Sequence, residues 1–254
     1  AGIDIILVGD SLGNVVLGYG NTVPVTLEEI LIHLKAVRRA VQRALLVADM
    51  PYGTFHTGDD DAVRNALRLV KEGGAEAIKL EGGHKRVHLV KRLVDEEISV
   101  MGHIGLTPQS INQLGAYRVQ GKTASTAQQL IDDAKAMEDA GAFAVVLEVV
   151  PREIAKMISE SISIPTIGIG AGVHCDIQVL VIHDMLGLSF SKQARFVRPY
   201  ANLREVMTDA VTRYAEDVRN GTYPSEAESY ALPAQTAAEL HIEVPSRDSK
   251  AEKS

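Results

Sequence analysis

The chain has little of several features that mark large classes of protein. Cys175 is its only cysteine among 254 residues, so these residues cannot form an intrachain disulfide framework, and the composition suits a reducing compartment such as the cytoplasm. Acidic residues outnumber basic ones by 33 to 26, and the net charge of −7 argues against non-specific binding to nucleic acid. No apolar run is long enough to cross a bilayer. We therefore expect a cytoplasmic protein without nucleic-acid or membrane partners.

Motifs for common cofactors and metals are also missing. The glycine-rich stretch from Gly168 to Gly172 lacks the G-x-G-x-x-G spacing and comes late in the chain, so it does not indicate a dinucleotide site. It is compatible either with a tight turn after a strand or with close approach of the backbone to a ligand. Cysteine and histidine residues do not show the spacing of zinc ligands, which argues against a zinc site.

What the sequence does contain is one pattern repeated along most of its length. A short apolar run ends in a polar or glycine-rich turn, and an amphipathic helix usually follows. Because uninterrupted apolar runs are typical of parallel strands covered on both faces, the pattern predicts an α/β fold, either a doubly wound sheet or a (β/α)8 barrel. Strands are predicted at Ile3–Val8, Leu45–Ala48, Ala77–Leu80, Ser99–Gly102, Phe143–Leu147, Thr166–Ile169 and Val179–Ile182. Helices are predicted at Leu27–Val41, Asp61–Glu72, Val87–Glu97, Ala124–Ala140, Arg152–Ser161 and Asn202–Asn220.

Seven predicted strands are one fewer than a closed TIM-type barrel needs. A βα unit of about 30 residues would complete the count, and we expect that the first unit is missing from this chain. Residues 1–233 are predicted to form a single barrel domain, and residues 234–254 a partly disordered C-terminal tail. The start of the first helix has a clear local signal, since Thr26 followed by Glu29 matches a capping box.

Ionisable residues stand at or just after several predicted strands. In a barrel enzyme the carboxyl ends of the strands meet at the mouth where catalysis occurs. The polar residues at these ends are Asp10, Ser11, Asp49, Lys79, Glu81, His103 and Glu148. Because side chains two residues apart on a strand share a face, Lys79 and Glu81 should point the same way.

Each of these residues also has an ordinary structural interpretation. Asp10 and Ser11 could cap the next helix, and Asp49 could be a turn residue before Pro51. A lone histidine is more often hydrogen-bonded structure than a catalyst. Convergence of all of them on one mouth favours a functional site. Asp10 and Asp49 on neighbouring strands would suit Mg²⁺, which prefers oxygen ligands.

Six segments together resemble the ketopantoate hydroxymethyltransferase family, over about Gly2 to Pro233. They are Val8–Gly13, Val47–Pro51, Lys79–Gly83, Gly102–Gln109, Val146–Glu148 and Ile167–Gly172. The resemblance implies a (β/α)8 TIM-type barrel of the phosphoenolpyruvate mutase and isocitrate lyase type. It implies transfer of a hydroxymethyl group from 5,10-methylenetetrahydrofolate to α-ketoisovalerate (3-methyl-2-oxobutanoate). The product is ketopantoate, for pantothenate and coenzyme A biosynthesis.

The resemblance also implies roles for the residues at the strand ends. Asp10 and Asp49 would bind Mg²⁺, with Glu81 in the outer coordination shell. Glu148 would be the general base that removes a proton from the keto acid, giving a Mg²⁺-stabilised enolate. Contacts with the keto acid would come from Asp10, Ser11, Asp49, Lys79 and His103. A homo-oligomer, by resemblance a decamer, is expected.

The sequence departs from the family pattern and leaves alternatives open. Ile177 stands where the family usually has glycine, and a β-branched residue resists positive φ. A related Mg²⁺-dependent, enolate-forming C–C lyase would usually carry a catalytic cysteine in a Lys-Cys-Gly-His motif, but Cys175 is in no such motif. The expected loss of the first βα unit would favour a truncated, non-catalytic barrel fragment. The complete set of polar residues at the strand ends argues against it.

Overall fold

The structure is a computed structural model that describes residues 1–190 and 193–243. The chain divides into two compact units, Ala1–Ala201 and a second that begins at Asn202. The first unit contains the strands β1 (Ile5–Val8), β2 (Leu45–Asp49), β3 (Ala77–Glu81), β4 (Val100–Gly105), β5 (Ala144–Glu148), β6 (Thr166–Ile169) and β7 (Ile177–Gln178). Its helices are α1 (Leu12–Val15), α2 (Leu27–Arg38), α3 (Asp59–Lys71), α4 (Val87–Asp95), α5 (Ile111–Leu114), α6 (Ala124–Asp139), α7 (Arg152–Ser161) and α8 (Ile182–Met185), with 3₁₀ turns η1 (His84–Arg86) and η2 (Pro108–Ser110).

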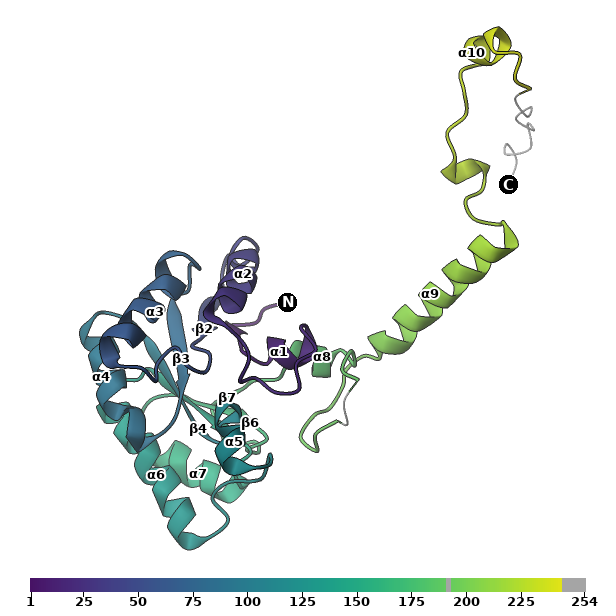
Figure 1. Ribbon diagram of the computed structural model, residues 1–254. Helices are drawn as coiled ribbons and strands as arrows, with labels where there is room; N and C mark the ends of the chain where they lie inside the picture. Colours follow the sequence, from purple (N-terminus) through teal and green to yellow (C-terminus); the bar gives the residue numbers. More distant parts are fainter. Residues whose placement is uncertain (191–192, 244–254) are drawn as a thin grey trace. The chain divides into compact units, whose positions relative to one another are not determined.

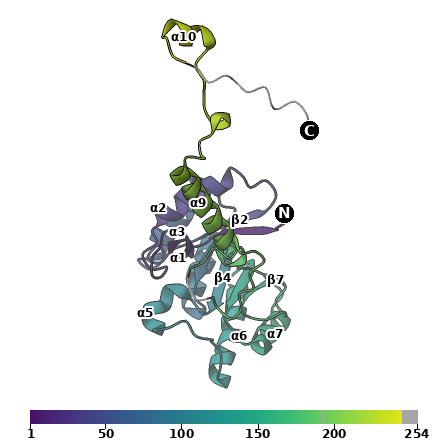
Figure 2. The same ribbon diagram turned by 90° about the vertical axis from the view of Figure 1, so that its right-hand side faces the viewer.

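The strands form one parallel sheet in the order in which they occur along the chain. The sheet curls into a half-barrel, and α2, α3, α4, α6 and α7 lie outside it (Figures 1 and 2). The predicted α/β class is confirmed. Among the described residues the pairing runs from β1 to β7, so an eighth strand is not seen, and the missing first βα unit stays a prediction. No helix in the described ranges combines the length and apolar character needed to cross a membrane.

The position predicted for the seventh strand is wrong. The prediction was Val179–Ile182, whereas β7 is Ile177–Gln178 and Ile182 begins α8. Pairing starts early because the carboxylate of Asp176 accepts hydrogen bonds from the backbone N–H and hydroxyl of Thr166, both at 2.8 Å. Periodicity cannot separate so short an apolar run from the start of a helix. Ile177 pairs with Ile167 and does not have positive φ, so its β-branched side chain fits the backbone conformation found there.

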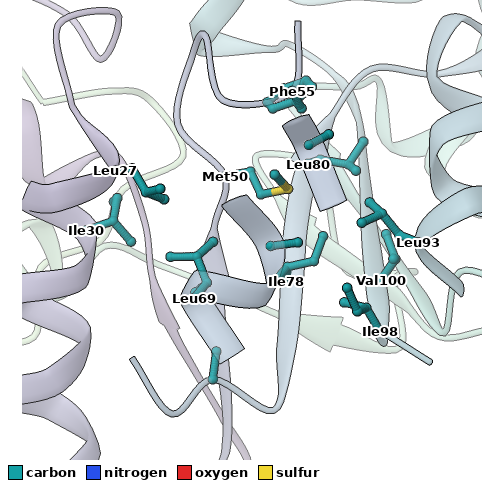
Figure 3. Packing of buried hydrophobic residues seen from close by; sticks show 14 of the residues in the cluster. Leu27, Ile30, Met50, Phe55, Leu69, Ile78, Leu80, Leu93, Ile98 and Val100 are labelled. Atoms are coloured by element: carbon teal, nitrogen blue, oxygen red, sulfur yellow. The ribbon is translucent and has the colours of Figure 1, made fainter. Parts of the chain in front are cut away.

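Strand alternation divides the buried side chains into two layers. Side chains on the outer face, such as Ile78 and Leu80 of β3, pack with Ile30 of α2, Leu69 of α3 and Leu93 of α4 (Figure 3). Side chains on the inner face form a separate apolar cluster made of Val47, Ala77, Met101, Ala144, Val146 and Ile167. Because successive side chains alternate, the polar residues Asp49, Lys79, Glu81 and His103 continue this inner layer toward the carboxyl ends of the strands.

Helix starts follow the local chemistry of the chain. The predicted capping box is confirmed, since Thr26 Oγ1 accepts from the N–H of Glu29 at 3.2 Å and Glu29 Oε2 accepts from the N–H of Thr26 at 2.7 Å. This orders the loop that leads from β1 into α2. By contrast, Ser11 precedes α1 without any side-chain capping bond, so helix capping does not explain Asp10 and Ser11.

The second unit contains α9 (Leu203–Asn220), η3 (Glu226–Glu228) and α10 (Ala234–Glu239). The predicted helix Asn202–Asn220 is confirmed to within one residue. Its apolar side chains include Val206, Met207 and Val211, each more than half exposed. The boundary after residue 233 stays a prediction. The helix α10 lies within the predicted tail, and residues 244–254 lie outside the described residues.

Two glycines offer a matched test of how tightly β4 and β5 are joined. Gly105 and Gly53 have nearly the same φ, +93° and +94°, but a Cβ on Gly105 would lie 2.4 Å from the carbonyl oxygen of Glu148, whereas a Cβ on Gly53 would meet nothing within 4 Å. Gly53→Ala should cost about 1 kcal/mol from backbone strain alone. Gly105→Ala should cost at least about 3 kcal/mol, because strain and overpacking add. Urea unfolding measures both, and equal costs would contradict this account of the β4–β5 contact.

Candidate active site

Five polar residues from the strand ends are buried together at the carboxyl edge of the sheet. Each of the five is at most 5 % exposed, and they are Asp10, Asp49, Lys79, Glu81 and His103. The strand register brings them together, because Asp49 pairs with Lys79 across β2 and β3, and Glu81 pairs with His103 across β3 and β4. The predicted convergence of these residues on one end of the sheet is therefore observed, and all but Asp10 lie on the inner face.

Lys79 is the centre of this cluster. Its Nζ lies 2.8 Å from Asp49 Oδ1 and 3.4 Å from His103 Nδ1. Burial opposes the charge on Lys79, but the nearby carboxylates of Asp49, Glu81 and Asp10 outweigh burial and hold its pKa above the ordinary value. The charged form of the buried Lys79 side chain is therefore favoured.

The carboxylates around Lys79 respond in the opposite sense. Burial, reinforced by the charge of Asp49, raises the pKa of Asp10 from 3.8 to about 7. Burial is also the main reason why the pKa of Glu81 lies well above its ordinary value. If all three carboxylates are ionised and Lys79 is charged, the buried cluster carries three negative charges and one positive charge. The resulting excess of two negative charges equals the charge of one divalent cation.

His103 connects this cluster with Glu148. Burial and the neighbouring Lys79 lower the pKa of His103, so its ring is neutral. An ammonium group can only donate, so Nδ1 must accept from Lys79, and the ring proton must be on Nε2. Nε2 lies 3.2 Å from Glu148 Oε2, within reach but without a well-aligned hydrogen bond. The Glu148 side chain is 17 % exposed, which leaves it more accessible than the cluster behind it.

The backbone that carries Glu148 is in an uncommon conformation. The next residue, Val149, has φ of +50°, which is rare for a β-branched residue. Two hydrogen bonds hold it there: its N–H donates to the carbonyl of Ile169 at 2.8 Å, and its carbonyl accepts from the N–H of Gln120 at 3.0 Å. The end of β5 is therefore fixed between β6 and the loop that follows α5.

Ser11 is the predicted site residue with the weakest link to the cluster. A Cβ added to Gly9 would lie 3.4 Å from Ser11 Oγ and 3.7 Å from Asp49 Oδ2, which shows that both side chains border the same glycine. No hydrogen bond joins Ser11 to the other predicted site residues among the contacts of the described residues. Its predicted contact with a keto acid stays a prediction.

Two residues near the cluster were not predicted as site residues. Gln109 is only 3 % exposed, and its Nε2 donates to Asp10 Oδ2 at 2.9 Å. Tyr117, in the loop after α5, has a pKa raised by burial and by the charges of Glu148, Asp10 and Glu81. Gln109 stands just past a strand end, a signal that could have suggested it, but the sequence did not show where its amide points.

The donor set is suitable for a hard divalent cation. Asp49 Oδ1 is buried and makes no well-aligned hydrogen bond, although Lys79 Nζ is close. Within the described part of the chain no group of three or more His, Cys, Asp and Glu side chains is arranged around a common point as metal ligands. Mg²⁺ commonly uses only one or two protein carboxylates together with waters and substrate oxygens. Asp10 and Asp49 fit that smaller set, because the backbone N–H of Asp10 donates to Asp49 Oδ2 at 3.2 Å and holds the two residues side by side.

Removing the central cation should destabilise the protein far more than removing an exposed one. Lys79→Met leaves Asp49 and its neighbours buried without their positive partner, and we expect a loss of about 3 kcal/mol or more in the free energy of unfolding. Lys91→Met is the control, since it breaks an exposed pair with Asp95 at 3.6 Å and should cost less than about 1 kcal/mol. Urea unfolding in EDTA at pH 7 compares them, and a similar small cost for both would refute the central role of Lys79.

The raised pKa of Asp10 predicts a pH dependence of stability. Between about pH 4 and pH 7 the folded protein keeps a proton on Asp10 that the unfolded chain has lost. Asp10 therefore makes the free energy of unfolding fall as pH rises through this range, by at most about 1.4 kcal/mol per pH unit. Asp10→Asn removes the titration, so the stability of this variant relative to wild type should increase from pH 4 to pH 7 and then level off. Urea unfolding in EDTA tests this, and a pH-independent difference would be the contrary result.

Comparison with known proteins shows which family the chain resembles. The family model for ketopantoate hydroxymethyltransferase matches residues 1–226. Relatives named 3-methyl-2-oxobutanoate hydroxymethyltransferase include one from Koribacter versatilis, 56 % identical over 95 % of this chain and 82 % of its own. Another, from Clostridioides difficile, is 52 % identical over 89 % of this chain and 82 % of its own.

Solved structures support the fold at much lower identity. A candidate lyase/mutase from Burkholderia cenocepacia superposes with a TM-score of 0.50 and 14 % identity, covering 94 % of this chain and 84 % of that one. This likeness is evidence for the α/β barrel-like fold alone. The family model covers most of the chain, and the relatives share more than half of their aligned residues with it. The chain therefore belongs to the ketopantoate hydroxymethyltransferase family.

Proposed function

We propose that this chain transfers a hydroxymethyl group from 5,10-methylenetetrahydrofolate to α-ketoisovalerate, giving ketopantoate. The observation that carries the proposal is the buried cluster around Lys79 with the more accessible Glu148 at its edge. Relatives that are more than half identical are named for this hydroxymethyl transfer. A homo-oligomeric state and a cytoplasmic location, expected from the sequence, stay predictions.

The first chemical requirement is removal of a proton from C3 of the keto acid. Glu148 is suited to accept it, because its carboxylate is partly exposed and its Oε2 lies 3.2 Å from His103 Nε2. The neutral His103 ring, with its proton on Nε2, would orient that carboxylate and leave the other oxygen for the substrate. A positioned carboxylate within hydrogen-bond reach of the substrate proton is what general-base catalysis needs.

The second requirement is stabilisation of the negative charge that proton removal creates. Mg²⁺ held by Asp10 and Asp49 would supply Lewis-acid polarisation of the keto group when it is bound. Lys79 provides a fixed positive charge beside Asp49, suited to the carboxylate of the keto acid. Preorganised charges in a buried site are effective because they need no rearrangement during the reaction. The resulting enolate carbon would then form a bond to the methylene carbon of the folate. Water would supply the hydroxyl oxygen as the bond from that carbon to the folate nitrogen breaks, which releases tetrahydrofolate.

The structure gives no support to a lyase that uses a catalytic cysteine. Cys175 is 7 % exposed, and burial raises the pKa of its thiol, so the reactive thiolate is disfavoured. It lies against Gly168 on β6, since a Cβ on that glycine would be 2.9 Å from its Sγ. The cysteine is therefore better explained as a packed core residue.

Proton exchange at C3 of α-ketoisovalerate in D₂O tests the proposed half-reaction without the folate. We expect exchange that is lost in EDTA and restored by Mg²⁺. Glu148→Gln should slow exchange by about 10²-fold or more, because the proton acceptor is removed, while keto-acid binding is kept. The control is Glu153→Gln at the exposed start of α7, which should exchange like wild type.

NMR of the C3 proton follows the exchange, and tetrahydrofolate release follows the complete transfer. Wild-type exchange in Glu148→Gln would remove Glu148 from the mechanism. Absence of exchange in a folded wild-type protein with Mg²⁺ would overturn the proposed function itself.

A further inference from the structure

One buried glutamine joins the ends of four strands. Gln109 belongs to η2, just after β4, and its backbone N–H donates to Glu81 Oε2 at the end of β3 at 3.0 Å. Its side-chain Nε2 donates to Asp10 Oδ2 after β1 at 2.9 Å and to the carbonyl of Met50 after β2 at 3.0 Å. Three of its donors therefore hold the residues at which the acidic cluster is built.

The side-chain amide of Gln109 has hydrogen-bond partners for its nitrogen but none for its oxygen. Both hydrogens of Nε2 have acceptors, whereas Oε1 is buried and has no hydrogen-bond partner within the protein. A buried carbonyl without a donor is unfavourable, and such groups usually mark a missing water or ligand. Because Oε1 and Nε2 share one carbon atom, this free acceptor is adjacent to the contact with Asp10.

The orientation of the amide is determined by its contacts. The Met50 carbonyl can only accept a hydrogen bond, so Nε2 and not Oε1 must face it, and the same nitrogen then also donates to Asp10 Oδ2. The turn that carries Gln109 begins at Pro108, and the preceding Thr107 is extended, with φ of −113° and ψ of 100°. Gln109 is thus delivered to the cluster by a locally ordered turn.

We propose that Gln109 is a positioning residue for the divalent cation. Its amide fixes one oxygen of Asp10 and its backbone fixes one oxygen of Glu81, while its free Oε1 accepts a hydrogen bond from a water carried by the cation. The inference rests on the proposed function, since it concerns the same metal-dependent site. A cation carries waters that can only donate, which is the chemistry that an unpaired buried carbonyl requires.

Mn²⁺ binding to metal-free protein, followed by the electron paramagnetic resonance of free Mn²⁺, tests the inference without any turnover. Gln109→Met keeps the length of the side chain but removes its donors and acceptor, and it should weaken Mn²⁺ binding by about 10- to 100-fold. Gln128→Met is the matched control, because Gln128 also donates to an aspartate, Asp132, at 2.9 Å but on the exposed surface of α6. Its Mn²⁺ affinity should equal that of wild type.

A second readout separates positioning from a purely structural role. In the exchange assay, Gln109→Met should need a correspondingly higher metal concentration for half-maximal rate. The rate at saturating metal should recover to within a few-fold of wild type, because the hydrogen bonds of Gln109 among the described residues go to Glu81, Asp10 and Met50 and not to Glu148. A structural role would instead lower stability to urea and leave the Mn²⁺ affinity of the folded variant unchanged, which overturns the proposal.

Gln109→Asn is a second variant that tests the same role if Gln109→Met does not fold. It keeps the amide but is one methylene shorter, so it cannot reach Asp10 and Met50 together, and it should show the same weakened Mn²⁺ binding. Near-UV circular dichroism shows which of the two variants keeps the native fold. If a natively folded variant binds Mn²⁺ as tightly as wild type, the positioning role of Gln109 is rejected and the proposed function still stands. Absence of Mn²⁺ binding to the wild-type protein would instead reject both the metal site and the role of Gln109. The two failures are therefore distinguished by whether the wild-type protein binds Mn²⁺.

Discussion

The ion pair between Lys79 and Asp49 is the interaction on which the site depends. Three carboxylates and an ammonium group are removed from water at the carboxyl edge of the sheet, and each would be strongly unfavourable if it were buried alone. The pairing of Asp49 with Lys79 across β2 and β3 sets a contact of 2.8 Å without any adjustment of a loop. Strand register, which is hard to change without losing the apolar layers, therefore fixes the electrostatics.

The two faces of the sheet have different physical tasks. The outer face packs against helices through two apolar clusters that supply most of the hydrophobic stabilisation. The inner face changes character along each strand, from apolar residues such as Met101 to polar ones such as His103 two positions later. Because the inner face ends in groups whose burial is costly, the stability of the fold must come mainly from the outer layer. This arrangement allows the site to be optimised for charge rather than for packing.

Much of the fold could be predicted from the sequence because its signals are local. Apolar runs identified β1 to β6 to within a few residues, and the Thr26–Glu29 pair located the start of α2. The position of β7 could not be predicted, since it is set by the contact of Asp176 with Thr166 rather than by apolar residues. The same limit applies to Gln109, which follows β4 and contacts residues at the ends of three other strands that meet only in the folded chain. Local patterns identified the charged candidates, but not the neutral side chain that joins them.

The neutral state of His103 connects the two halves of the site. Lys79 can only donate to Nδ1, and this fixes the ring proton on Nε2, toward Glu148. A protonated ring would instead pair with Glu148 as an ion and compete with its role as a base. Burial and the ammonium of Lys79 both oppose that protonation. The same cation that balances the carboxylates of the proposed metal site therefore also keeps the proposed base available, so the charge on Lys79 links cation binding with proton removal.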